Sequence, residues 1–136
     1  AAQHADIIGL APRLLAPSKA DLRSVLAEET AEKIEWVRRA AGARFATLEL
    51  NTYPCLGPIQ VTNDRRAAAQ TLAEQLRQRY GAELGVDELL DSPHVFLGTV
   101  EQLAQKCLEL RERFGITYLL VLGDKRAFAP VIEQLT

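Results

Sequence analysis

The sequence contains no methionine at any of its 136 positions, the first included. It opens with Ala1-Ala2-Gln3 and passes within a few residues into the apolar segment Ile7 to Leu10. This opening is typical of the tail of a helix that enters a strand. We therefore expect the sequence to start inside a larger protein, either by truncation or because upstream residues are missing. Removal of an initiator methionine is the alternative.

Cysteine, histidine and long apolar runs are also scarce, and each scarcity excludes a class of protein. The two cysteines, Cys55 and Cys107, are too few for a disulfide scaffold, and two lone histidines without a Cys-x-x-Cys motif do not predict a metal site. No apolar run approaches the roughly 18–20 residues that span a bilayer. The start of the chain also lacks the basic head and long apolar stretch of a signal peptide. We therefore expect a cytoplasmic protein that binds no metal and no membrane.

The composition that is present is ordinary for a globular domain. Apolar residues make up 48% of the chain and charged residues 25%, and the net charge is −2. Such a charge gives no general attraction to nucleic acid or to anionic membranes. A chain of 136 residues can bury a core, so we expect one domain over residues 1–136.

Apolar periodicity and helix-capping residues predict strands that alternate with helices. The expected strands are Ala5–Leu10, Phe45–Thr52 and Ile116–Leu122, with a short extended piece at 59–61 and a segment at 94–97 that is ambiguous between strand and loop. The expected helices run from Ser18 to about Ala41, from Asn63 or Asp64 to Tyr80, from Val86 to Leu90, from Thr99 to Phe114 and from about Arg126 to Leu135. This alternation predicts an α/β fold with parallel strands and right-handed crossover helices.

The number of strands is small for an independent sheet. Both edges of a three-stranded parallel sheet stay open, and strands buried on two faces need more neighbours. A complete barrel of β/α units takes about 250 residues, and this chain holds about three such units, or four if 94–97 is a strand. We therefore expect a partial barrel that is truncated at its N-terminus.

Several segments resemble, in the same order, the luciferase-like monooxygenase superfamily. They are Ala5–Leu10, Trp36–Gly42, Phe45–Asn51 with its Glu-Leu-Asn end, Ser92–Leu103 with its Gly-Thr helix start, Phe114–Val121 and Ala127–Ile132. Together they cover nearly the whole chain. The resemblance implies the C-terminal portion of a TIM-type (β/α)8 barrel that uses coenzyme F-420, a deazaflavin, with flavin mononucleotide (FMN) as the alternative. The implied chemistry is hydride transfer, or oxygen activation in flavin members, and the cofactor supplies it.

The candidate cofactor-binding residues are Gly9, Asn51, Lys125 and Arg126, because chemistry in barrels lies at the carboxyl ends of the strands. Gly9 either lets a ring or phosphate approach closely or only packs. Asn51 either hydrogen-bonds a cofactor or substrate carbonyl or ends its strand by bonding nearby backbone. Lys125 and Arg126 either pair with a phosphate or acidic tail or form a solvated helix start.

Other polar residues are expected to be structural. Asp91, Ser92 and His94 are residue types of a catalytic triad, but a triad is assembled from separate elements, whereas these lie within one short segment. His94 is expected to be a loop or packing histidine. Cys55 has no cationic cluster beside it in the sequence to lower its pKa, and Cys107 lies on an apolar helical stripe. No catalytic residue can be assigned.

The expected function is therefore that of a fragment of an oxidoreductase or monooxygenase that acts on a small-molecule substrate. The family's early strands and the glycine-rich segment that precedes its Ala5–Leu10 counterpart are absent from this sequence. The chain alone is thus not expected to be active. The alternative is a non-catalytic half-barrel assembly module. Either reading predicts a homo-oligomer or a partner that supplies the remainder of the barrel.

Overall fold

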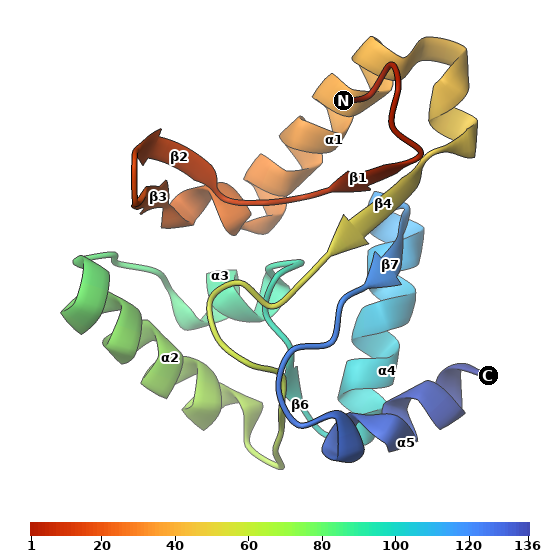
Figure 1. Cartoon of the computed structure of the whole chain (residues 1–136). Helices are drawn as coiled ribbons and strands as arrows, with labels where there is room; N and C mark the ends of the chain where they lie inside the picture. Colours follow the sequence, from red (N-terminus) through yellow and green to blue (C-terminus); the bar gives the residue numbers. More distant parts are fainter.

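A three-stranded parallel sheet lies at the centre of the α/β fold. The computed structural model describes all 136 residues. The sheet contains β1 (Ile7–Gly9), β4 (Glu49–Thr52) and β7 (Ile116–Leu119) in the order β1-β4-β7 (Figure 1). The strands are parallel and adjacent in chain order, which confirms the predicted α/β class and the parallel pairing of its strands.

The other elements connect these strands or follow the last of them. They are the hairpin β2 (Arg13–Ala16) and β3 (Lys19–Asp21), the 3-10 turn η1 (Leu22–Val25), α1 (Ala27–Ala41), the 3-10 segment η2 (Gly42–Thr47), β5 (Gln60–Val61), α2 (Arg65–Tyr80), α3 (Val86–Asp91), β6 (Leu97–Gly98), α4 (Val100–Glu109), the π-helical segment η3 (Leu110–Phe114) and α5 (Lys125–Leu135). None of the helices combines the length and the apolarity that a bilayer span requires.

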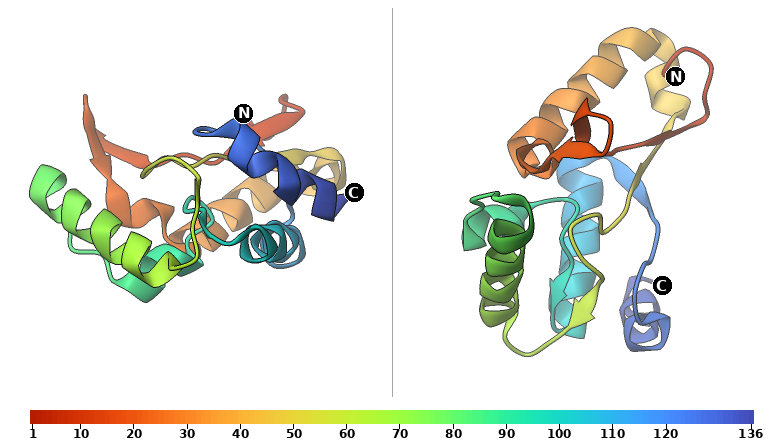
Figure 2. Two further views of the ribbon diagram at one scale, coloured as in Figure 1. Left: turned by 90° about the horizontal axis from the view of Figure 1, so that it is seen from below. Right: turned by 60° about the vertical axis from the view of Figure 1, so that its left-hand side comes forward.

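Helices cover only one face of the central sheet. Figure 2 (left) shows α1 and α4 on the same side of the strands. The main core lies there, where Ile8, Leu50 and Ile116 of the three strands meet apolar residues of α1, α4 and α5. The other face carries residues that remain largely exposed: Tyr118 and Leu120 are 42% and 46% exposed. Side chains alternate across a regular strand, and the register shift between Ile116 and Tyr118 turns Tyr118 to the face opposite Ile116.

A second, smaller core lies under α2 and α3. It contains Leu26, Leu76, Leu84, Leu89 and Val95. The short parallel pair β5–β6 borders it, and Gln60 N donates to Phe96 O at 3.0 Å. The predicted extended piece at 59–61 is therefore confirmed, and the segment at 94–97 reaches a strand only at its last residue, Leu97.

The predicted helix caps are largely confirmed. Asp64 accepts from Ala67 N at the start of α2, which ends at Gly81 with φ 65°. Thr99 and Gln102 form a reciprocal capping box at α4. These bonds satisfy amides that have no partner within the helix.

The predicted helix start at Ser18 is wrong. Residues 13–21 form an antiparallel hairpin, and Ser18 lies in its turn with φ 64°. Asp21 caps η1 by accepting from Arg23 N, and α1 begins only at Ala27. The helix is shorter because the chain must first turn back on itself after β1.

All three predicted strands are also shorter than expected. Strand β1 covers only Ile7–Gly9 of the predicted Ala5–Leu10. The first residues of the 45–52 segment form η2, so β4 covers only Glu49–Thr52. Strand β7 ends at Leu119, although Leu120 N still donates to Thr52 O at 3.0 Å. A register shift between β4 and β7 interrupts the regular ladder, as a bulge does.

Candidate functional site

Gly9 and Asn51 lie side by side at the carboxyl ends of β1 and β4. They are register partners in the parallel pair, and a Cβ atom on Gly9 would lie 3.8 Å from Asn51 Oδ1. That distance is an ordinary contact, so packing does not require glycine here. With Tyr118 and Leu120 of the β7 segment, the two residues form what we call the strand-end face. The fold thus brings together two of the four predicted site residues.

The Asn51 amide ties β4 to β7. Its Nδ2 donates to Tyr118 O at 3.2 Å and to Thr52 O at 3.3 Å. These bonds match the expected structural role of a strand-ending asparagine. Oδ1, however, accepts no hydrogen bond from the chain and faces the side of Gly9. One acceptor of the strand-end face is therefore free for a donor from outside.

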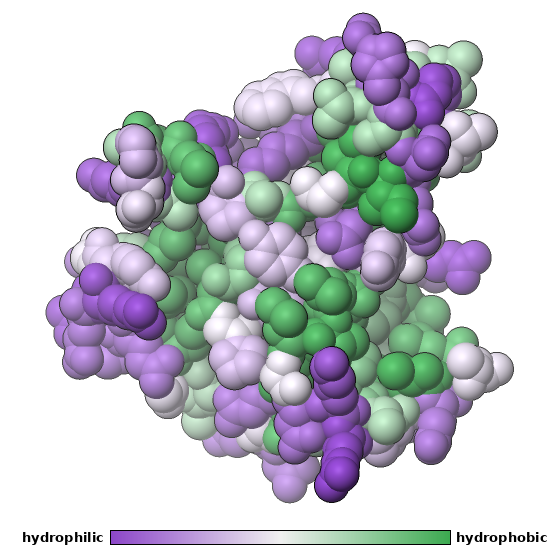
Figure 3. Space-filling view, viewed as in Figure 1, coloured by the Kyte–Doolittle hydropathy of each residue, from purple (hydrophilic) through white to green (hydrophobic).

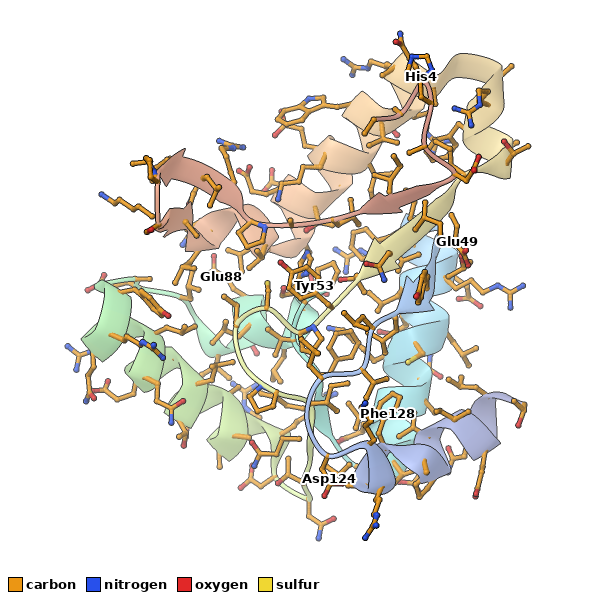
Figure 4. The ribbon with its side chains drawn as sticks, in the orientation of Figure 1. His4, Glu49, Tyr53, Glu88, Asp124 and Phe128 are labelled. Carbon is orange, nitrogen blue, oxygen red and sulfur yellow. The ribbon has the colours of Figure 1, made fainter.

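Lys125 and Arg126 lie elsewhere, at the start of α5. Both side chains are exposed and neither forms an ion pair. Asp124 Oδ1 accepts from Arg126 N at 3.0 Å and from Ala127 N at 3.1 Å, so a carboxylate already occupies the helix start. Figure 4 shows Asp124 at the bottom of the molecule, at the start of α5, whereas Tyr53, which follows β4, lies near the middle. The geometry is that of a solvated helix start with its own cap.

A fully buried histidine holds the chain just after β4. His94 Nδ1 lies 3.0 Å from Tyr53 O and 3.1 Å from Thr52 Oγ1, and Thr52 Oγ1 donates to Pro93 O. A carbonyl oxygen can only accept, so Nδ1 carries the ring proton and donates to Tyr53 O. Nε2 is then a buried acceptor without a partner. The Tyr53 ring meets the imidazole edge-on, with centroids 5.9 Å apart.

The surroundings of His94 keep its ring neutral. Burial lowers the pKa of His94 to about 4, and the positive charges of Lys33 and Lys106 act in the same direction. The hydrogen bond to Tyr53 O opposes this effect. Burial dominates because the imidazolium loses its hydration and gains no carboxylate partner.

Asp91, Ser92 and His94 do not form a triad. Ser92 Oγ donates to Val25 O at 2.6 Å and accepts from His94 N at 3.1 Å, so no imidazole nitrogen contacts the hydroxyl. Asp91 pairs instead with Arg113 at 2.6 Å and 3.2 Å. The segment therefore joins η1 to the end of β4. This assigns His94 the packing role that the sequence predicted.

Lys33 is a polar residue that sequence reasoning missed. Its Nζ donates to Ala11 O and to Ser24 O, each at 2.6 Å, and so joins α1 to the loop after β1. Burial lowers the pKa of Lys33. The available signal was its place on the stripe of α1 that also holds the buried Thr30 and Ile34.

Cys55 lies near Lys33 but remains a protonated thiol. Burial raises the pKa of Cys55 to about 11, and the positive charge of Lys33 offsets only part of this effect. Burial also raises the pKa of Cys107. A thiol of this kind is a poor nucleophile at neutral pH. No group of three or more His, Cys, Asp or Glu side chains is placed to hold a metal ion.

Comparison of the chain with protein-family models, with curated proteins and with solved structures gives no match.

Proposed function

We propose that the chain is the C-terminal portion of a TIM-type barrel from a luciferase-like oxidoreductase, and that its strand-end face forms one wall of a deazaflavin or flavin pocket. The observation that carries the proposal is the one-sided sheet. Its strands follow chain order β1-β4-β7, with α1 and α4 on one face and the other face exposed. In a doubly wound sheet the strand order reverses and helices cover both faces, whereas barrel helices all lie outside.

The strand-end face suits the ring of such a cofactor. Gly9 has no side chain to hinder the approach of a ring beside Asn51, and Asn51 Oδ1 is an unused acceptor for a ring N–H. Tyr118 and Leu120 add exposed apolar surface on the same side of the sheet. A bound flavin or deazaflavin supplies hydride transfer, and the protein supplies position and exclusion of water.

The fit is partial, because the phosphate end of the cofactor has no cradle in these residues. Asp124 fills the start of α5, and the side chains of Lys125 and Arg126 extend into solvent. We therefore assign no catalytic residue and propose that other strands complete the pocket. On this proposal the chain alone binds the ring weakly and does not turn over substrate.

A titration observed residue by residue tests the proposal. The isotope-labelled chain is titrated separately with F-420 and with FMN, and amide chemical shifts are followed by NMR. We expect weak, saturable shifts at Gly9, Asn51 and Tyr118. Asn51→Ala should abolish them, whereas Asn63→Ala, in the exposed loop before α2, should not. Absence of saturable shifts at these residues, or tight binding by a monomer, would contradict the proposed incomplete pocket.

A second candidate is a non-catalytic half-barrel that self-associates through the exposed face. Tyr118, Leu120 and Leu122 are each more than two-fifths exposed, which is unusual for a cluster of large apolar side chains. A dimer by size-exclusion mass that binds neither cofactor would favour this module over the oxidoreductase.

A further inference from the structure

The outer edge of β7 carries unpaired backbone groups. Strand β7 pairs with β4 on one side and with no strand on the other. Leu120 N donates to Thr52 O, and Leu122 O accepts from Ile59 N, so residues 120 and 122 face the β4 side. Alternate residues of a strand point their N–H and C=O groups in opposite directions. Leu119 and Val121 therefore present theirs at the open edge.

An apolar groove of about 200 Å³ runs beneath this edge, between β7, α4 and α5. Its lining includes Leu110, Leu119, Val121, Phe128 and Ile132, and no charged side chain. Leu110 and Phe128 belong to the main core, so the groove is an open extension of that core. Figure 3 shows apolar surface over the segment after β7 and beside α5.

The groove is open because α5 presents apolar side chains to solvent. Ile132 is 51% exposed, although it follows the fully buried Val131, and Leu135 is 39% exposed. Surface apolar residues that continue a core indicate an interface rather than scattered exposure. The neighbouring backbone edge identifies what fits there, because unpaired strand groups are satisfied by another extended strand.

We propose that this edge and groove receive a further β-strand that runs parallel to β7, carries uncharged apolar side chains toward the groove, and is followed by a helix against Ile132 and Leu135. The absence of charge in the lining excludes a strand with charged groove-facing residues. Every pair in the central sheet is parallel, and the groove lies on the side of the crossover helices. The inference rests on the barrel of the proposed function and names the neighbour that its closure requires.

A strand probe tests the inference directly. The labelled chain is mixed with a short, end-capped peptide that alternates valine and threonine, and amide hydrogen exchange is measured by NMR. The amides of Leu119 and Val121 should become protected, whereas those of Ile7 and Gly9, which point to the open edge of β1, should not. The same peptide with aspartate in place of valine should give no protection.

Variants of the chain supply the matched controls. Val121→Pro removes an outward N–H and keeps the inward bonds of Leu120 and Leu122, and Ile132→Glu places a charge at the groove. Each should weaken peptide binding at least about tenfold. Ala129→Glu adds the same charge to an exposed position of α5 outside the groove lining and should leave binding unchanged.

Several outcomes would overturn the inference. One is protection of the edge amides of β1 instead of those of β7, and another is peptide binding that Ile132→Glu does not weaken. A third is protection of Leu119 and Val121 in the absence of peptide, if that protection increases with protein concentration. The last result would show that a second copy occupies the edge. Peptide binding without cofactor binding would refute the proposed oxidoreductase and support this inference, and the reverse result would refute the inference alone.

Discussion

His94 shows how much one residue contributes when its side chain is buried without solvent. The imidazole is fully buried, donates its only N–H to Tyr53 O and leaves Nε2 without a hydrogen-bond partner. A second proton would enter a site near the cations Lys33 and Lys106 with no acceptor for it. The contacts around the end of β4 are therefore stable only while the His94 ring is neutral.

The stability of the fold should therefore fall in mild acid because of His94. Its pKa is about 4 when folded and 6.5 at the ordinary value, so the unfolded chain binds more protons between these pH values. Stability is full above pH 6.5 and is lost as pH falls toward 4, by up to about 3 kcal/mol. Urea unfolding at steps from pH 7 to pH 4 measures this contribution.

His94→Asn isolates the effect from that of the carboxylates, because its amide nitrogen can replace Nδ1 and does not titrate. The variant should lose less stability between pH 7 and pH 4 than the original chain. His4→Asn, at an exposed position at the far end of the sheet (Figure 4), serves as the comparison and should keep the original dependence. Equal pH dependence in the original chain and His94→Asn would contradict the assignment.

The residue-scale features that sequence could predict are those with local causes. Asn51 was expected either at a ligand or bonding nearby backbone, and its Nδ2 bonds backbone. The contact between His94 and Thr52 joins positions 42 residues apart and has no local signature. The same holds for Lys33, whose partners Ala11 and Ser24 depend on how the hairpin turns.

At the scale of elements, the hairpin β2–β3 is the largest departure from expectation. Ser18 resembled a helix cap because it precedes an amphipathic run, but its φ of 64° places it in a turn. The caps at Asp64 and Thr99 were predictable because each bonds an amide three residues away. A hairpin turn without Asn-Gly or Asp-Gly lacks the strongest local signal.

Ser18→Gly should stabilise the hairpin. A non-glycine residue in the left-handed region is strained, and glycine removes that strain at some cost in chain entropy, for a net gain of about 0.5 to 1 kcal/mol. Thermal unfolding followed by circular dichroism measures the change. Lys19→Gly, one residue later in the extended strand β3, should instead lower stability. A lower melting temperature for Ser18→Gly would contradict the turn.

At the scale of the whole molecule, strand and helix alternation sufficed to predict an α/β fold with a parallel sheet. The pair β5–β6 escaped full prediction because strands of two residues carry no periodicity. The only sequence signal that helices cover one face of the sheet was the alternation of apolar Leu48 and Leu50 with polar Glu49 and Asn51. Such alternation marks one buried face but does not say what lies on the other.

A pair of leucine truncations measures whether the exposed face is bare in solution. Leu50 is 2% exposed on the covered face, whereas Leu120 is 46% exposed on the open face. Leu50→Ala should cost about 2–5 kcal/mol of unfolding free energy, and Leu120→Ala less than about 1 kcal/mol. Denaturant unfolding at several protein concentrations gives both values. A cost for Leu120→Ala as large as that for Leu50→Ala, and one that depends on concentration, would show that association of copies already covers this face. In that case the strand-end face would be an interface between chains rather than the open wall of a cofactor pocket.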